Sequence, residues 1–259
     1  MSNVVPIRRT PKVAEPEKVS AMVVAGSGGA STTTSTFGLA TALRLGTGKD
    51  ITAIDSTSDG GNLLSRTRFR AVDPARSIDS LSARMAETTS GMVVVGSSHH
   101  GHSADPMMVD LLLEGRASAR VHDVGTALRS PRLAPLIQSG AALVVVAPAR
   151  SEPLSRMREA MNWLKSTFGP DTLGETIVVV SHQMPTSPVE LAPIRAALAP
   201  QIAGFVEVPF DPVLARPGVI DHRRLSTATI DAWTDALDVL GTLSPQSDAR
   251  RDGKAGELA

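Results

Sequence analysis

The feature of the sequence that most constrains its fold is the alternation of short apolar runs with longer amphipathic stretches. Runs such as AALVVVA and TIVVVS are continuously apolar and rich in β-branched residues, which is typical of parallel strands covered on both faces. Strands of this kind are expected at residues 21–25, 50–55, 91–96, 119–123, 141–147, 175–181 and 204–208. Helical periodicity is expected at residues 33–45, 78–87, 106–113, 132–138, 153–167, 189–197 and 227–243. This order predicts an α/β fold, namely a doubly wound, mostly parallel sheet of seven to eight strands with helices on both faces.

The chain of 259 residues is long enough for one large domain, which we place at residues 21–243. Residues 1–20 carry three prolines and alternating charges without periodicity, so they are expected to form a flexible leader. Residues 244–259 are equally polar and are expected to form a disordered tail. No apolar run approaches the roughly 20 residues that a membrane helix needs, so a cytoplasmic protein without membrane attachment is expected.

Composition excludes several classes of chemistry. The absence of cysteine rules out disulfides, thiolate zinc sites, iron–sulfur clusters and cysteine nucleophiles. Because 26 basic residues balance 26 acidic ones, net charge does not attract the chain to nucleic acid or anionic lipid.

A run of small residues, GSGGASTTT at positions 26–34, links the first expected strand to the first expected helix. Glycine tolerates positive φ and close approach, so such a turn lets backbone N–H groups surround an anion at the helix N-terminus. The phosphate-loop motif G-x-x-x-x-G-K-[ST] is not matched, because Ser31 replaces its last glycine and Thr32 its lysine. From this segment alone, an anion site and an ordinary capped turn remain alternatives.

The order and spacing of five segments resemble the ParA/MinD family of deviant-Walker-A ATPases, which position DNA, septa or secretion machinery. These segments are GSGGASTTTSTFGLATAL, ITAIDSTSDGGNLLSR, VHDVGTALRS, ALVVVAPARSEPLSRM and VEVPFDPVLARPGVID. The resemblance spans about residues 21–243 and implies a P-loop NTPase-like fold, ATP or ADP with Mg²⁺ as cofactors, and a homodimer. Some relatives that localise pili or septa, of the TadZ/CpaE type, have a loop similar to this one.

The resemblance also implies a nucleotide site whose residues can be named. Gly28 and Gly29 match the family's paired glycines, Thr34 matches the residue beside the α-phosphate, and Gly125 matches the glycine beside the γ-phosphate. The whole phosphate loop would consist of Gly26, Ser27, Gly28, Gly29, Ala30, Ser31, Thr32, Thr33 and Thr34. The family's adenine-contacting loop is matched by Pro209, Phe210 and Asp211.

The same resemblance implies the metal ligands and the catalytic carboxylates. Thr33 matches the hydroxyl residue that ligates magnesium, and Asp123 matches the Walker B aspartate. Asp55 matches the acidic residue that ends the second strand and positions magnesium or the attacking water. Asp55 and Asp123 are therefore the candidate catalytic residues, and both join Thr33 as candidate metal ligands.

Two departures from the family concern positive charge. Ser27 aligns with the signature lysine that reaches the partner's phosphates, and Thr32 aligns with the main phosphate-loop lysine. A charge-assisted contact contributes about 1.5–3 kcal/mol, so losing one weakens nucleotide binding roughly 10- to 100-fold. The resulting alternatives are a weak ATPase switch, a pseudo-ATPase scaffold with protein partners in a positioning or secretion system, and an active DNA-partition ATPase. In the last, another residue supplies the charge, with candidates Arg129, Arg132 and Arg150.

Two further clusters have a functional and an ordinary interpretation. The imidazoles of His99, His100 and His102 could ligate a metal, or simply form a polar loop. Asp59 fits turn chemistry. The pair at residues 223 and 224, both arginine, could contact DNA non-specifically or form a solvated face. Helical spacing indicates core packing for Trp233, Leu237 and Leu240.

Overall fold

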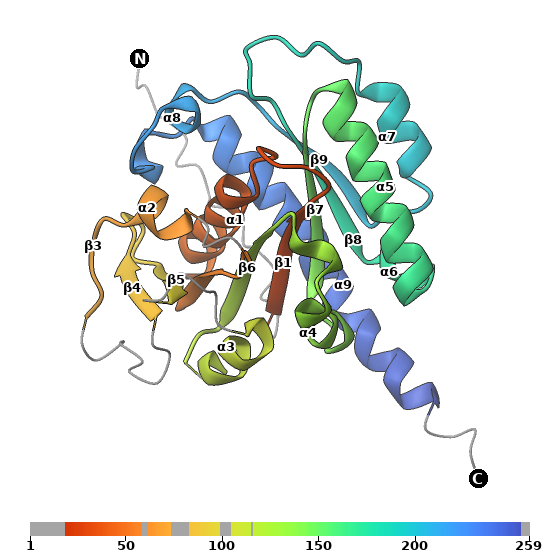
Figure 1. Cartoon of the computed structure of the whole chain (residues 1–259), viewed down its shortest axis with the longest axis horizontal. Coiled ribbons are helices and arrows are strands. Elements are labelled where there is room, and N and C mark those ends of the chain that lie inside the picture. Colours follow the sequence, from red (N-terminus) through yellow and green to blue (C-terminus); the bar gives the residue numbers. More distant parts are fainter. Residues whose placement is uncertain (1–18, 59–61, 74–82, 99–104, 115, 255–259) are drawn as a thin grey trace, which may run out of the picture.

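The computed structural model describes residues 19–58, 62–73, 83–98, 105–114 and 116–254. Its strands are β1 Val19–Ala25, β2 Ile51–Asp55, β3 Arg70–Ala71, β4 Ala83–Glu87, β5 Val93–Ser98, β6 Ala119–Gly125, β7 Ala142–Pro148, β8 Thr176–Ser181 and β9 Gly204–Val208. They form one nine-stranded sheet in the order β3-β4-β5-β2-β6-β1-β7-β8-β9 (Figure 1). The pairs from β5 to β9 are parallel, whereas β4 is antiparallel to both β3 and β5. The expected doubly wound, mostly parallel sheet is confirmed.

Helices cover both faces of this sheet (Figure 1). They are α1 Thr32–Thr47, α2 Leu63–Thr67, α3 Pro106–Leu113, α4 Ala134–Gln138, α5 Ser151–Phe168, α6 Asp171–Gly174, α7 Ala192–Leu198, α8 Pro212–Ala215 and α9 Thr227–Lys254, with short 3₁₀ turns at Ala127–Arg129, Pro131–Leu133 and His222–Arg224. Along β1, Ala21 and Val23 face the core shared with α1 and α9, while Met22 and Val24 face the core shared with α4 and α5. The strands are continuously apolar because both faces are buried.

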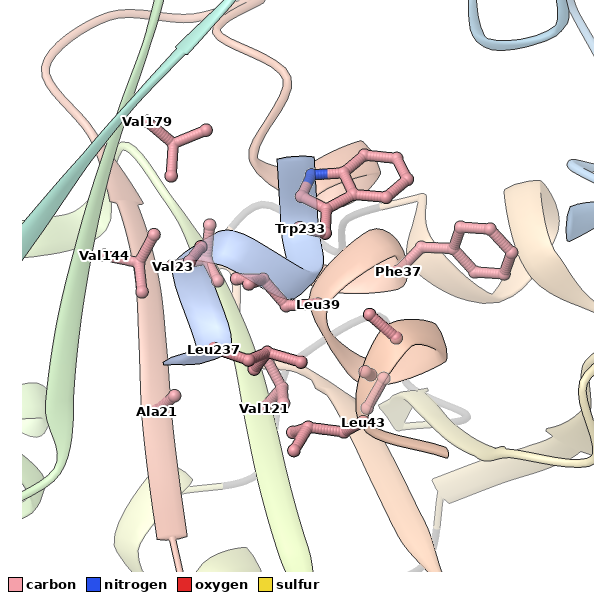
Figure 2. Close-up of a cluster of buried hydrophobic side chains, with 14 of the residues drawn as sticks. Ala21, Val23, Phe37, Leu39, Leu43, Val121, Val144, Val179, Trp233 and Leu237 are labelled. Atoms are coloured by element: carbon pink, nitrogen blue, oxygen red, sulfur yellow. The ribbon is translucent and has the colours of Figure 1, made fainter. Parts of the chain in front are cut away.

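Apolar side chains of α1 and α9 pack together in the core on one face of the sheet (Figure 2). Trp233 and Leu237 of α9 are buried against α1, as the helical spacing predicted. A Cβ on Gly38 would lie 2.1 Å from the Trp233 ring, so glycine is required at this helix crossing. The two helices therefore approach each other closely at Gly38.

Two expectations about secondary structure differ from the structure. The helix expected at residues 78–87 is wrong, because residues 83–87 form β4, while residues 78–82 lie outside the described part. Strand pairing places Glu87 opposite Arg70, and the two side chains form an ion pair at 2.5 Å. With β3 and β4 added, the sheet exceeds the seven to eight strands expected.

The chain ends also differ from expectation where the structure describes them. Helix α9 continues through the start of the expected disordered tail as far as Lys254. Val19 and Ser20, placed in the flexible leader, already belong to β1, and the rest of that leader lies outside the described residues. Among the described residues, no helix is long and apolar enough to cross a bilayer.

Candidate functional site

The loop between β1 and α1 has the left-handed backbone conformations of an anion-binding turn. Gly29 has φ of 68° and Ser31 has φ of 67°, and Ser31 is the one non-glycine residue with positive φ in the described part of the chain. A Cβ on Gly26 would lie 2.3 Å from the Arg156 carbonyl oxygen, so the loop packs directly on α5. Added Cβ atoms at Gly28 and Gly29 would meet no atom within 4 Å, which shows that the outer side of the loop is open.

A cavity of about 590 Å³ lies over this loop. The loops that follow β1, β2 and β6 converge on it, as expected where parallel strands end at one edge of a sheet. The cavity is lined by residues 27–34, 57, 58, 62, 66, 124–127, 183 and 214. Eight of the nine expected phosphate-loop residues and Gly125 are among them, and Gly26 supports the loop from behind.

Of the candidate metal ligands, Thr33 lines the cavity, whereas the buried Asp55 and Asp123 are not among its lining residues. Thr33 Oγ1 donates a hydrogen bond of 2.5 Å to Asp123 Oδ2, and the Gly125 amide donates to Asp123 Oδ1 at 3.2 Å. Asp55 and Asp123 are direct neighbours in the β2–β6 register, and both are buried. Asp55 Oδ1 accepts from the Thr57 hydroxyl at 2.7 Å. The fold thus gathers a hydroxyl and two carboxylates from three separate segments of the chain.

Burial raises the pKa of Asp123 to about 6, and the nearby charge of Asp55 adds to this effect, while the hydrogen bond from Thr33 opposes it. In the part of the chain that the structure describes, no cationic side chain lies beside this buried carboxylate to stabilise its charged form, and a divalent cation would supply the positive charge. Mg²⁺ prefers hydroxyl, carboxylate, phosphate and water oxygens, so Thr33, Asp55 and Asp123 fit it. Among the described residues, no group of three or more His, Asp or Glu side chains is arranged to hold a metal ion, so a cation here would need further oxygen ligands from water or a bound phosphate.

The cationic residue in the cavity lining is Arg66, which the sequence analysis missed. Its guanidinium donates to the backbone carbonyls of Leu214, Arg216 and Gly218 at 3.1, 2.8 and 2.7 Å. Arg66 thereby links α2 to α8 and to the segment that follows α8, at one wall of the cavity. No motif in the sequence marked this residue, since its partners lie about 150 positions away.

The three arginines considered as sources of charge are dispersed. Arg150 donates to the Gln183 side chain at 3.0 Å. Arg129 is exposed and lines a second cavity of about 550 Å³, which shares Ser27 with the first. Arg132 lines neither cavity.

The residues expected at an adenine do not line the cavity. Asp211 instead caps α8, accepting from the Val213 and Ser226 amides at 2.9 and 2.8 Å and from the Thr229 hydroxyl at 3.0 Å. Although burial opposes the effect, these hydrogen bonds lower the pKa of Asp211. Leu214, from the helix that Asp211 caps, reaches the cavity in place of Pro209 and Phe210.

The arginines at residues 223 and 224 do not line the cavity. Arg223 is paired with Asp221 at 2.8 Å, and its guanidinium carbon lies 5.7 Å from the centre of the Phe69 ring. Asp59, His99, His100 and His102 lie outside the described residues.

No protein-family model matches the sequence, and no curated protein matches it. Solved structures do match it over most of its length. A ParA family ATPase from Chlorobium tepidum is 12% identical, with 85% of this chain and 98% of that chain covered and a TM-score of 0.60. The MinD cell division protein of Aquifex aeolicus is 16% identical, with 87% and 97% covered and a TM-score of 0.57. A point variant of Cyanothece McdA in complex with ATP is 15% identical, with 87% and 97% covered and a TM-score of 0.57. The chain therefore has the fold of these ATPases, as the resemblance in sequence implied.

Proposed function

We propose that this chain is a ParA/MinD-like positioning protein that binds a magnesium–nucleotide on the loop of residues 26–34 and hydrolyses it slowly or not at all. The observation that carries the proposal is the contact between Thr33 and Asp123 beneath an open, left-handed loop, with neutral side chains at Ser27 and Thr32. Residues that could hold a cation are present in this proposed site, whereas the two lysines that would contact phosphate are absent.

Each retained part has a chemical task. Thr33, Asp55 and Asp123 would hold Mg²⁺, which neutralises phosphate charge when it is bound. The first-turn amides of α1, which have no acceptor within the helix, would donate to phosphate oxygens together with the loop amides. Support for this ligand comes from the fold neighbours, which include the ATP complex of the McdA variant and a Borrelia burgdorferi plasmid partition protein bound to AMPPNP.

Slow turnover follows from electrostatics. Phosphoryl transfer depends on positive charge positioned around the transferring group, and in the cavity lining Arg66 is already engaged by three carbonyls. The chain would then act as a dimeric scaffold or switch that recruits a protein partner, as in the MinC:MinD cell division complex.

A second candidate function is an active partition ATPase, and one observation favours it. Arg129 lines the cavity that adjoins Ser27, where the family's signature lysine would stand. If Arg129 supplies charge during transfer, purified protein hydrolyses ATP and Arg129→Ala abolishes this turnover. An unaffected Arg129→Ala variant would remove this candidate.

Calorimetric titration with magnesium–ATP tests the main proposal. Thr33→Val removes the hydroxyl that contacts Asp123 and should weaken binding at least tenfold, about the size of a lost charge-assisted contact. Thr36→Val is the matched control, because Thr36 lies on the same helix, is fully buried and has a hydroxyl without a hydrogen-bond partner. Equal binding by both variants, or no binding by the wild type, contradicts the proposal.

A further inference from the structure

Ser31 stands where a phosphate loop has glycine, and the structure shows what its side chain contacts. Its hydroxyl oxygen accepts from Gln183 Nε2 at 3.0 Å and from the Ser181 hydroxyl at 3.3 Å. The same Gln183 nitrogen donates to the Gly29 carbonyl at 2.7 Å. The segment after β8 is therefore bonded to both left-handed residues of the loop.

Gln183 is itself held from its other side. Its Oε1 accepts from Arg150 Nη2 at 3.0 Å, so both ends of the amide are engaged and its orientation is set. Arg150 immediately precedes α5, the helix on which the loop packs through Gly26. The loop is thus held between α5 and the end of β8, and no lysine takes part.

We propose that Gln183, oriented by Arg150, is a positioning residue that holds Ser31 in its left-handed conformation and so keeps the loop ready for phosphate. A side chain with a Cβ disfavours positive φ, and a conformation of this kind persists when its surroundings determine it. The serine hydroxyl provides the attachment point that glycine lacks. The serine at position 31 and Gln183 then depend on each other, because the serine hydroxyl accepts the hydrogen bond by which Gln183 holds the loop. Its effect on nucleotide binding rests on the function proposed above.

Two kinds of measurement separate this role from a general effect on stability. Gln183→Leu removes both donors, and the expected result is a roughly threefold to tenfold weaker magnesium–ATP affinity, about the size of one to two exposed hydrogen bonds. Without nucleotide, hydrogen exchange of the amides in residues 26–34 should be faster in this variant. Gln201→Leu is the matched control, since Gln201 is exposed and its side chain bonds the nearby Ala197 carbonyl at 3.3 Å.

The decisive comparison is made in the Ser31→Gly background, where left-handed φ needs no support. There Gln183→Leu should have a clearly smaller effect on affinity and loop exchange, because only its contact with the Gly29 carbonyl remains to be lost. An equal loss in both backgrounds would mean that Gln183 acts independently of Ser31 and would overturn the proposal, as would unchanged exchange in Gln183→Leu. If the wild type binds no nucleotide, the function proposed above fails, while loop exchange still decides the role of Gln183.

Discussion

Two buried aspartates on neighbouring elements, Asp110 of α3 and Asp123 of β6, differ in their hydrogen-bond donors within the described residues: Asp110 has a cationic donor, whereas Asp123 has only neutral ones. Asp110 accepts from Arg120 at 2.7 and 3.0 Å, from His122 at 3.0 Å and from the Ser20 hydroxyl at 2.5 Å. Burial raises the pKa of Asp110, but these hydrogen bonds outweigh it and hold the pKa well below its usual range. Asp123 has hydroxyl and amide donors without a cation, and its pKa is raised to about 6.

The difference separates a structural carboxylate from a candidate binding carboxylate. The Asp110 cluster is closed by its own arginine, and His122 extends it to the Ser56 hydroxyl at 2.9 Å. The Asp123 cluster opens onto a cavity through Thr33. A buried charge without a counter-ion destabilises a fold, and this is a physical ground for the cation site proposed above.

The largest expected effect comes from removing the arginine that pairs with Asp110. Arg120→Met leaves Asp110 buried without its cation, and unfolding free energy in urea should fall by about 3–5 kcal/mol. Arg158→Met, at an exposed arginine of α5, is the control and should change stability by less than about 0.5 kcal/mol. If Arg120→Met does not fold, Arg120→Lys keeps the charge and should lose less. A loss below about 1 kcal/mol in Arg120→Met would show that the cluster is not closed by this arginine.

Removing the negative charge of Asp123 should instead increase the free energy of unfolding. Because the folded pKa of Asp123 lies above its ordinary value of 3.8, its favourable contribution is complete below about pH 4 and is lost as pH rises through about 6. Asp123→Asn should therefore be more stable than the wild type at pH 8, by about 3 kcal/mol at about 1.4 kcal/mol per pKa unit. Urea unfolding at pH 4 and pH 8 measures this, and a gap that does not widen with pH contradicts it.

Supplying the missing cation should strengthen nucleotide binding. Thr32→Lys places an ammonium at the start of α1 and should tighten magnesium–ATP binding by about 1–3 kcal/mol, the range of a charge-assisted hydrogen bond. Ser31→Gly need not accompany it, since Ser31 already has positive φ. Thr47→Lys adds the same charge at the far end of α1 and should have no effect. Calorimetry that finds Thr32→Lys and wild type equal would mean that the cavity does not hold phosphate.

The smallest expected effect is the pH dependence of magnesium–ATP affinity. A cation at Asp123 requires the ionised form, so magnesium–ATP affinity should rise about tenfold between pH 5 and pH 7. Calorimetry in two buffers of different ionisation enthalpy should detect proton release at about pH 5.5, after correction for the titration of free magnesium–ATP. Binding without proton release would place the cation away from Asp123.

Local patterns in the sequence were sufficient to predict the central strands, and the family resemblance pointed to Thr33 and Asp123, which the structure brings into contact. Buried parallel strands have a strong apolar signature, and site residues directly follow such strands. Residues 83–87 were misassigned because β4, which lies between β3 and β5, has a mixed pattern of polar and apolar residues, and its buried Glu87 is paired with Arg70. The capping contacts of Asp211 were not predicted because its partners Ser226 and Thr229 follow 15 and 18 residues later, beyond its own motif.

The sequence by itself determined the sheet, the glycine-rich turn at its carboxyl edge and the absence of lysine there, because these depend on residue type and local spacing. Only the tertiary structure decided which side chains complete the site. Arg66 reaches a wall segment 148 to 152 positions away, and Gln183 reaches Gly29 across 154 positions. Such pairs depend on how strands and helices pack, and side-chain hydrogen bonds between distant segments leave no periodic trace in the sequence.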